Sequence, residues 1–144
     1  MNQKLITLAV IVFSITSIKC LAQDLDSIHV YALSMKSMYR IRIDRDLIKN
    51  EVEPIVLAEK GKMQAIYETL IKRVKGRMRN NLKSNQLDIR LFFEFFENGK
   101  VVNTIGVTPY NTMFVNFTLY SCDQQKLKYL DEYVSGLSGI LGIR

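Results

Sequence analysis

The sequence predicts an α+β fold: an antiparallel sheet of about five strands with its helices packed on one face, in the order β-β-α-β-β-β-α. Three observations support this prediction. Residues 87–95 alternate apolar and other side chains, two turn signals follow them, and apolar residues recur at helical spacing on either side of these strands. Helices that flank an antiparallel meander pack most economically on a single sheet face.

Residues 1–22 have the features of a cleaved secretory signal. Lys4 supplies a positive start, an apolar run of 14 residues covers 5–18, and small residues lead up to Ala22. The apolar run is short for a membrane span, which needs about 20 residues. We therefore expect a single exported domain, 23–144, in the periplasm or outside the cell.

Removal of this signal lowers the formal net charge from +6 to +4, because Lys4 and Lys19 leave with it. Lys19 is a poor neighbour for lipidation of Cys20, since a small residue is expected there. Cys122 remains as the one cysteine of the exported chain, so no intramolecular disulfide forms within it. Its expected place is buried beside the last strand.

Two short strands are predicted at 28–33 and 38–44, which are rich in β-branched and aromatic residues. Asp44 is a candidate N-cap for a short helix. Asp46 would lie in the first turn of that helix, where the positive end of the helix dipole favours a carboxylate. Pro54 has no N–H to donate, so we expect the helix to end before it.

A longer helix is predicted after Gly61, with one apolar stripe and one basic face. The stripe contains Met63, Ile66, Leu70, Val74 and Met78, flanked by Tyr67 and Ile71. The basic face, Lys72 to Arg79, is either solvated or in contact with an anionic surface.

A last helix is predicted from Asp123, its N-cap, to a stop at Gly136 and Gly139. Its inner side contains Leu127, Leu130, Val134 and Leu137. The apolar tail 140–143 is expected to pack in part against the domain.

The first hairpin of the central sheet turns at Asn98 and Gly99. A two-residue loop would mix the two faces of the strands. We favour a three-residue loop with Gly99 as the bulged residue, because it places apolar pairs on one side. The pairs are Phe95 with Val101, Leu91 with Ile105, and Ile89 with Val107.

A second turn is predicted at 108–111, which contains Pro109, and a single third strand at 112–120. The inward residues of that strand are Met113, Val115, Phe117 and Leu119. In this register the outer sheet face collects the candidate partner-binding residues Arg90, Phe92, Glu94, Phe96, Phe114 and Tyr120. Aromatic residues beside Arg are enriched at protein interfaces. The alternative is that the first strands, the segment around Pro54 or the tail covers this face.

The residue inventory predicts no catalytic, cofactor-binding or metal-binding site. His29 and Cys122 are the single histidine and cysteine of 23–144, whereas zinc sites need about four such ligands. The sequence contains neither a Walker-type nor a GxGxxG phosphate loop. Asp88 and Glu94 would lie about 20 Å apart along one strand, too far for the paired acids of a glycosidase.

We therefore expect a small exported, non-catalytic protein that binds another macromolecule through its aromatic sheet face, as an inhibitor or immunity-type protein of the bacterial envelope would. Its partner is a second protein or another copy of the chain, with weak contact to anionic surfaces and no specific nucleic acid. Two alternatives stay open. One is an enzyme or small-ligand carrier with a pocket between sheet and helices, and the other is a structural homodimer unit.

Overall fold

The structure, a computed structural model, describes residues 25–72, 75–77, 87–116 and 118–143. Its elements are β1 (Ser27–Ala32), α2 (Arg45–Glu51), β2 (Ile55–Leu57), α3 (Lys60–Lys72), β3 (Lys75–Arg77), β4 (Leu91–Glu97), β5 (Lys100–Val107), β6 (Thr112–Val115), β7 (Thr118–Ser121), the 3-10 helix η2 (Gln124–Glu132) and α4 (Leu137–Leu141). The strands form one sheet in the order β2-β1-β4-β5-β6-β7-β3, and every neighbouring pair is antiparallel. This confirms the predicted α+β fold class.

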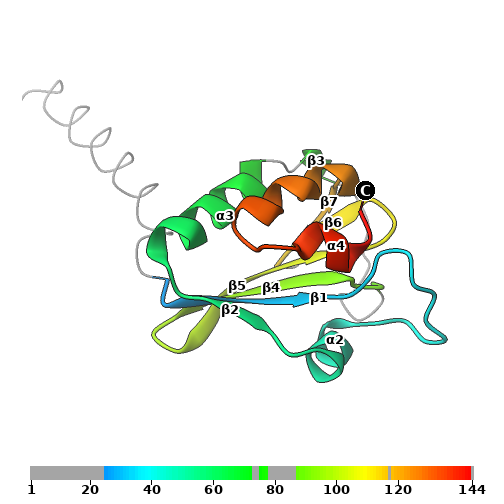
Figure 1. Cartoon of the computed structure of the whole chain (residues 1–144), viewed down its shortest axis with the longest axis horizontal. Helices are drawn as coiled ribbons and strands as arrows, with labels where there is room; N and C mark the ends of the chain where they lie inside the picture. Colours follow the sequence, from blue (N-terminus) through cyan, green and yellow to red (C-terminus); the bar gives the residue numbers. More distant parts are fainter. Residues whose placement is uncertain (1–24, 73–74, 78–86, 117, 144) are drawn as a thin grey trace, which may run out of the picture.

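The helices α3, η2 and α4 lie together on one face of the sheet (Figure 1). One last helix was predicted on this face, ending at Gly136 and Gly139, but the structure has a 3-10 helix that ends at Glu132 and a separate α4, because Gly136 with its φ of 78° is the N-cap of α4. The first hydrophobic core fills the space between them and the sheet. It includes Met63, Ile66 and Leu70 from α3, Leu91, Phe93 and Phe95 from β4, and Leu127, Leu130, Val134 and Leu137 from the C-terminal segment. Asp123 is the N-cap of η2, since its side chain accepts a hydrogen bond from the Gln125 backbone N–H. The tail packs down through Leu141 and Ile143.

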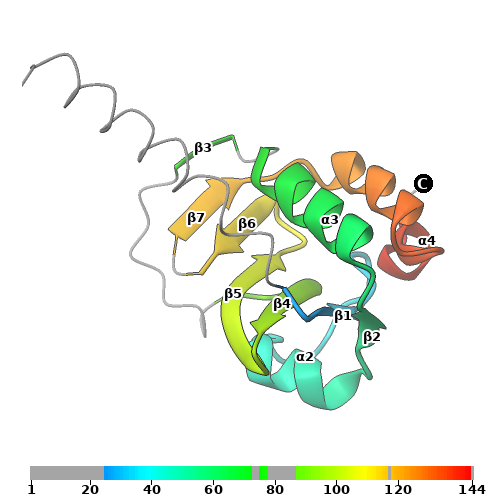
Figure 2. The same cartoon turned by 90° about the vertical axis from the view of Figure 1, so that its left-hand side faces the viewer.

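The helix α2 covers the opposite face of the sheet, which the sequence left open (Figures 1 and 2). It begins where predicted, because Asp44 Oδ1 accepts hydrogen bonds from the backbone N–H groups of Asp46 and Leu47. Ile48 of this helix and Ile43 before it are fully buried in a second hydrophobic core. The sheet is therefore covered on both faces.

The second core is built on one row of residues that crosses the sheet. Neighbours in this row pair directly across the strands from β1 to β7. The row is Tyr31, Phe92, Gly106, Phe114 and Leu119. Gly106 lies between two aromatic rings, and the centroids of Phe92 and Phe114 are 6.2 Å apart.

The β4–β5 hairpin differs from the predicted one. Its turn is the two-residue form, with positive φ at both Asn98 and Gly99. Phe96 pairs with Val101 and Phe95 with Asn103, so the extra residue lies further along β5. The register that we favoured is therefore wrong. Apolar faces do meet in the observed register, because Leu91 faces Val107 and Phe93 faces Ile105.

The predicted third strand is in fact a hairpin of two short strands, β6 and β7. Asn116 has a φ of 53° and opens the turn, so Val115 pairs with Thr118. The Asn116 backbone N–H donates to Thr104 O at 2.8 Å, and its side-chain Oδ1 accepts from the Thr104 N–H at 2.9 Å. The reversal places Leu119 beside Phe114 rather than beside Met113.

Three other local predictions were wrong or fall outside the described part. Residues 38–44 are an irregular segment and not a strand. The short strand β2 follows Pro54, and β3 stands where the basic helix face was expected to continue. Residues 1–22, Val74, Met78 and Phe117 lie outside the described residues. Within the described ranges, no helix has the length and apolar character needed to cross a membrane.

Candidate functional site

The sheet face proposed as a partner surface is largely internal. Phe92 and Phe114 are 1% and 2% exposed, and Arg90 and Glu94 are also buried. The prediction that these side chains form an exposed surface is wrong, because α2 and the residues before it cover them. Lys49 of α2 reaches over Glu94, with Nζ 2.8 Å from Oε1.

Glu94 also accepts a hydrogen bond from the Tyr31 hydroxyl at 3.2 Å. Burial, and then the charge and the hydrogen bond of Glu94, raise the pKa of Tyr31 to about 12. The hydrogen-bonded pair of Tyr31 and Glu94 is therefore part of the protein interior beside the second core.

The other two predicted residues, Phe96 and Tyr120, are half-buried and do not lie together. Phe96 is near the end of β4, where its ring lies 4.4 Å from that of His29. Tyr120 pairs with Met113, a residue of the first core, and so belongs to the opposite face from Phe114. The six predicted residues thus do not form one site.

His29 and Cys122 also lie apart, on opposite sides of the sheet. His29 pairs with Glu94 and shares its face, whereas Cys122 is buried in the first core. Burial, with a smaller effect of the Asp123 carboxylate, raises the pKa of the Cys122 thiol to about 11. A nucleophilic Cys/His pair is therefore not formed by these two residues.

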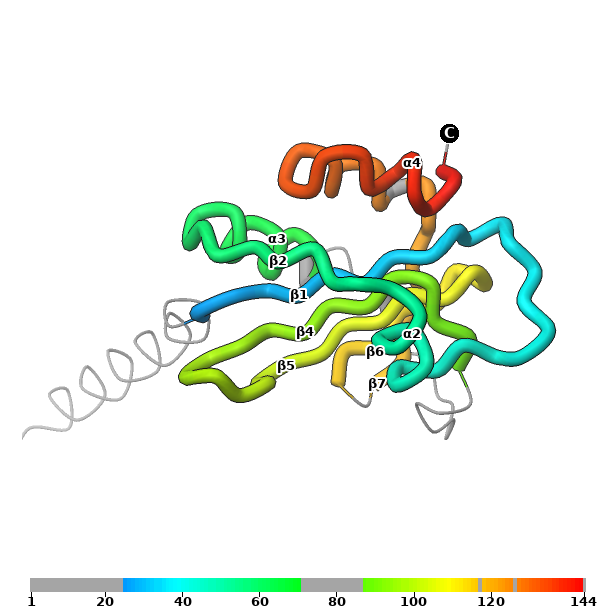
Figure 3. The backbone as a smooth tube through the Cα atoms, turned by 60° about the horizontal axis from the view of Figure 1, so that its bottom comes forward, coloured from blue at the N-terminus to red at the C-terminus, as the bar shows by residue number. Residues whose placement is uncertain are grey.

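A different surface collects the exposed apolar side chains. Every residue from 36 to 42 is exposed, and we call this segment the 36–42 loop. Figure 3 shows the chain bending away from the body of the domain between β1 and α2. Met38 is 99% exposed and Ile41 is 64% exposed. The free energy falls when a partner removes such exposed apolar side chains from water.

Both ends of this loop are fixed by backbone contacts. Before it, Leu33 N–H donates to Arg90 O at 2.7 Å, and Met35 N–H donates to Leu141 O at 2.9 Å. After it, Ile43 N–H donates to Asp88 Oδ1 at 3.0 Å. The loop is thus exposed along its length and anchored at both ends, as binding segments commonly are.

A cleft of about 450 Å³ opens between this loop and the β5–β6 turn. One wall is formed by residues 39–42, the floor includes Leu87 and Asp88, and the other wall is formed by Thr108, Tyr110 and Thr112. Tyr110 is 72% exposed at the rim. The cleft therefore continues the exposed surface of the loop, and its size is within the range of ligand sites.

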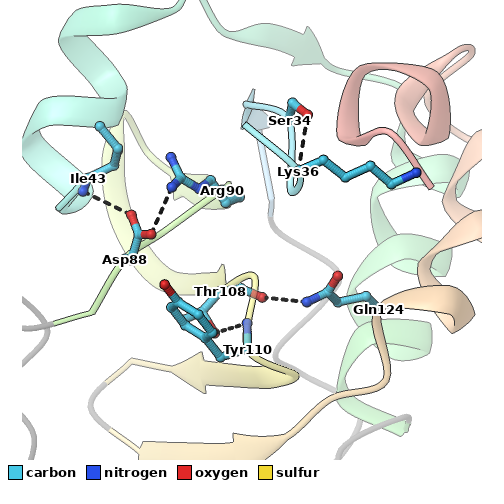
Figure 4. Close-up of polar contacts among 8 residues, drawn as sticks. All are labelled: Ser34, Lys36, Ile43, Asp88, Arg90, Thr108, Tyr110 and Gln124. Carbon is cyan, nitrogen blue, oxygen red and sulfur yellow. Dashed lines mark hydrogen bonds and ion pairs between the residues drawn. The ribbon is translucent and has the colours of Figure 1, made fainter. Parts of the chain in front are cut away.

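Asp88, in the floor of the cleft, forms an ion pair with Arg90, which is buried and does not itself line the cleft (Figure 4). Arg90 Nη2 lies 2.8 Å from Asp88 Oδ2, and the other Asp88 oxygen accepts the bond from Ile43. The Tyr39 ring lies over the guanidinium, with its centroid 4.3 Å from Cζ. Tyr39 thus connects the exposed loop to the buried charge.

The second wall is held by hydroxyl contacts (Figure 4). Thr108 and Thr112 share a hydrogen bond of 2.5 Å between their hydroxyl oxygens, and the Tyr110 backbone N–H donates to the Thr108 hydroxyl at 3.2 Å. Gln124 reaches back from η2 to the Thr108 carbonyl. The position of Tyr110 at the rim is therefore fixed by the turn and not by its own ring.

The acidic and metal-ligating side chains described near this cleft are few. Among the residues that the structure describes, no group of three or more His, Cys, Asp or Glu side chains is placed to hold a metal ion. A second hollow, lined by Asp26, Lys60 and Glu97 among others, mixes both signs of charge.

Sequence reasoning missed the cleft because residues 39–42 alternate as a strand does, and the exposure of Met38 had no signal of its own.

Comparison of the chain with protein-family models, with curated proteins and with solved structures gives no match. The function is therefore argued from these residues alone.

Proposed function

We propose that this chain is a small exported, non-catalytic protein that binds another macromolecule through the 36–42 loop and the cleft beside it. In a bacterial envelope, this function takes the form of an inhibitor or immunity-type protein that occupies a secreted enzyme or toxin. The proposal moves the predicted binding function from the sheet face to a new surface, since the sheet face is covered by α2.

The observation that carries the proposal is the exposure of Ile41 and Tyr110 on the two walls of one cleft, with Met38 exposed in the same loop as Ile41. Met, Tyr and Arg are enriched at protein interfaces, and Arg40 and Arg42 lie among these apolar residues. Full burial of one such apolar side chain contributes about 1.5–3 kcal/mol. Two such side chains at the cleft, with a third in the adjoining loop, can therefore anchor a partner, whereas scattered exposed residues cannot.

The fixed ends of the loop support the same function. A segment that is already held at Leu33, Met35 and Ile43 loses less conformational entropy on binding than a free one. A small-ligand carrier remains the second candidate, because the volume of the cleft suits a small molecule.

A photo-crosslinking amino acid placed at Met38 tests the proposal in the cell that produces the protein. Val56 is the matched control, since it is an exposed apolar residue on β2, away from the cleft. We expect a crosslinked adduct from position 38 and none from position 56. The adduct should disappear in the Ile41→Ser and Tyr110→Ser variants.

Adducts that form equally from both positions, or from neither, would contradict a binding surface at the loop. An adduct of the chain with itself, together with a dimer in light scattering at micromolar concentration, would identify a homodimer unit instead. Binding of a small molecule that Ile41→Ser abolishes, with no protein adduct, would favour the carrier.

A further inference from the structure

We infer that the cleft beside the 36–42 loop binds an extended acidic segment of a partner protein, in which carboxylates alternate with apolar side chains. This inference rests on the proposed function and adds the chemistry of the partner. It follows from the charges that line the cleft, from the ion pair that neutralises its one acid and from its shape.

The charges of the lining have an excess of positive sign. Arg40 and Arg42 are exposed on one wall, and Asp88 is the one acid among the residues that line the cleft. Asp88 is already occupied, since one oxygen lies 2.8 Å from Arg90 Nη2 and the other accepts the Ile43 N–H. The two exposed guanidinium groups therefore have no competing acid in this lining, and they attract an incoming anion.

The buried guanidinium of Arg90 cancels the charge of the one acid in the described lining. Arg90 is 3% exposed, and within the described residues its Nε and Nη1 atoms are buried without a hydrogen-bond partner. One carboxylate, that of Asp88, is its ion-pair partner. The floor thus does not repel a carboxylate, although it contains an acid.

The partner must also supply apolar groups. Ile41 and Leu87 contribute aliphatic surface to the cleft, and the rings of Tyr39 and Tyr110 stand on its two sides. In an extended peptide, successive side chains point in opposite directions, so acids and apolar residues can meet different parts of this lining. Guanidinium groups pair with carboxylates in a planar, bidentate geometry that gives specificity to such a contact.

The hollow shape favours a peptide segment over a membrane. An anionic bilayer would meet the exposed Met38 and Arg40 at the crown of the loop, but a flat surface does not enter a cleft of about 450 Å³. A polypeptide strand does enter a cleft of this size, because ligand sites lie in this range of volume. The structure therefore points to a peptide segment, and a membrane is an outcome to be tested.

The test uses two short fluorescein-labelled peptides and protein expressed from its full-length sequence. In one peptide Glu alternates with Leu, Ser and Tyr, and in the other Gln replaces every Glu. We expect the Glu peptide to bind, with an affinity that falls as salt is added, and the Gln peptide to bind much more weakly. The double variant Arg40→Gln/Arg42→Gln should lose about tenfold or more in affinity.

The matched control removes the same charge elsewhere. Lys100 lies at the β4–β5 turn and Lys128 in η2; both are exposed and neither lines the cleft. The variant Lys100→Gln/Lys128→Gln should retain the wild-type affinity within about twofold. Equal losses in the two double variants would show that net charge alone binds the peptide, and would overturn the inference.

Two further outcomes would also overturn it. One is equal binding of the Glu and Gln peptides. The other is binding to phosphatidylglycerol vesicles that depends on Arg40 and Arg42, with no binding of the Glu peptide. The crosslink from Met38 separates this inference from the proposed function. If the Arg40→Gln/Arg42→Gln protein still forms the adduct while Ile41→Ser does not, the binding function stands and the acidic partner is excluded.

Discussion

Gly106 is the position where a single methyl group should disturb the second core most directly. A Cβ at Gly106 would lie 2.9 Å from Cδ1 of Phe114 and closer still to Cε1 and Cζ of the same ring. Carbon atoms normally stand about 3.5–4.0 Å apart, so the ring must move. Phe114 is packed near Phe92, with the ring centroids 6.2 Å apart, and has little space to do so. We expect Gly106→Ala to lower the free energy of unfolding by about 1–3 kcal/mol.

The size of the effect should depend on the Phe114 ring alone. A leucine at position 114 lacks Cε1 and Cζ, the two ring atoms that lie nearest to the methyl group added at position 106. Phe114→Leu by itself should cost roughly 1–2 kcal/mol. In that background, Gly106→Ala should cost about zero or stabilise by about 0.5 kcal/mol, because Ala loses less conformational entropy than Gly in a strand.

The assay is urea denaturation of the wild type, the two single variants and the double variant, compared at equal m values. The coupling energy from this cycle measures the contact between the methyl group and the ring. If Gly106→Ala costs the same with and without the Phe114 ring, the proposed reason for the glycine is refuted.

Three side chains elsewhere in the fold give further predictions. Asp44→Ala removes the N-cap of α2 and should cost about 1 kcal/mol in urea denaturation, whereas Asp44→Asn should cost much less; equal costs would exclude a capping role. Lys49→Met leaves the buried Glu94 carboxylate without the cation 2.8 Å away. We expect a loss of roughly 1–3 kcal/mol in the free energy of unfolding, less than for a fully buried pair because water reaches Lys49. An unchanged stability would contradict the pairing. Because burial raises the pKa of the Cys122 thiol from 9.0 to about 11, iodoacetamide should react about 100-fold more slowly at pH 8 than with the unfolded chain, and a native rate equal to the unfolded one would exclude burial. The unfolded thiol ionises first, so this group should destabilise the fold progressively as the pH rises from about 9 to about 11.

The elements that local sequence signals specify could be predicted well. Asp44 and Asp123 were identified as N-caps because a short acidic side chain satisfies the free N–H groups of a first helical turn, whatever lies around it. The stripe of α3 was found in the same way, since period and burial agree at Met63, Ile66 and Leu70.

The errors arose where long-range packing decides. Period-two alternation continues through 112–120, but the positive φ of Asn116 reverses the chain, and its stabilising contacts with Thr104 are distant in sequence. In the same way, residues 39–42 alternate like a strand but form none. Asp88 accepts a hydrogen bond from the Ile43 backbone N–H, and Arg90 packs against the Tyr39 ring. Sequence reasoning cannot identify these tertiary partners without the fold.

The candidate site could not be predicted for the same reason. Alternation correctly assigned Phe92 and Phe114 to one face, but the sequence does not say that α2 returns to cover that face. A helix of seven residues has too short an apolar stripe to reveal what it packs against. The exposed loop is defined by the contacts that fix its two ends, and these are visible only in three dimensions.

The contacts of Asn116 also limit how much of the outer edge of β5 is free to pair with a strand of another molecule. Within the described residues, the outer side of β5 pairs with β6 only from Ile105 to Val107. Asn116 then occupies both backbone groups of Thr104. The remaining open edge, Lys100 to Asn103, has a charge at one end and a bulge within it, and both features hinder the addition of a foreign strand. One asparagine, through its backbone N–H and its side-chain oxygen, thus shortens the edge on which fibre growth could start.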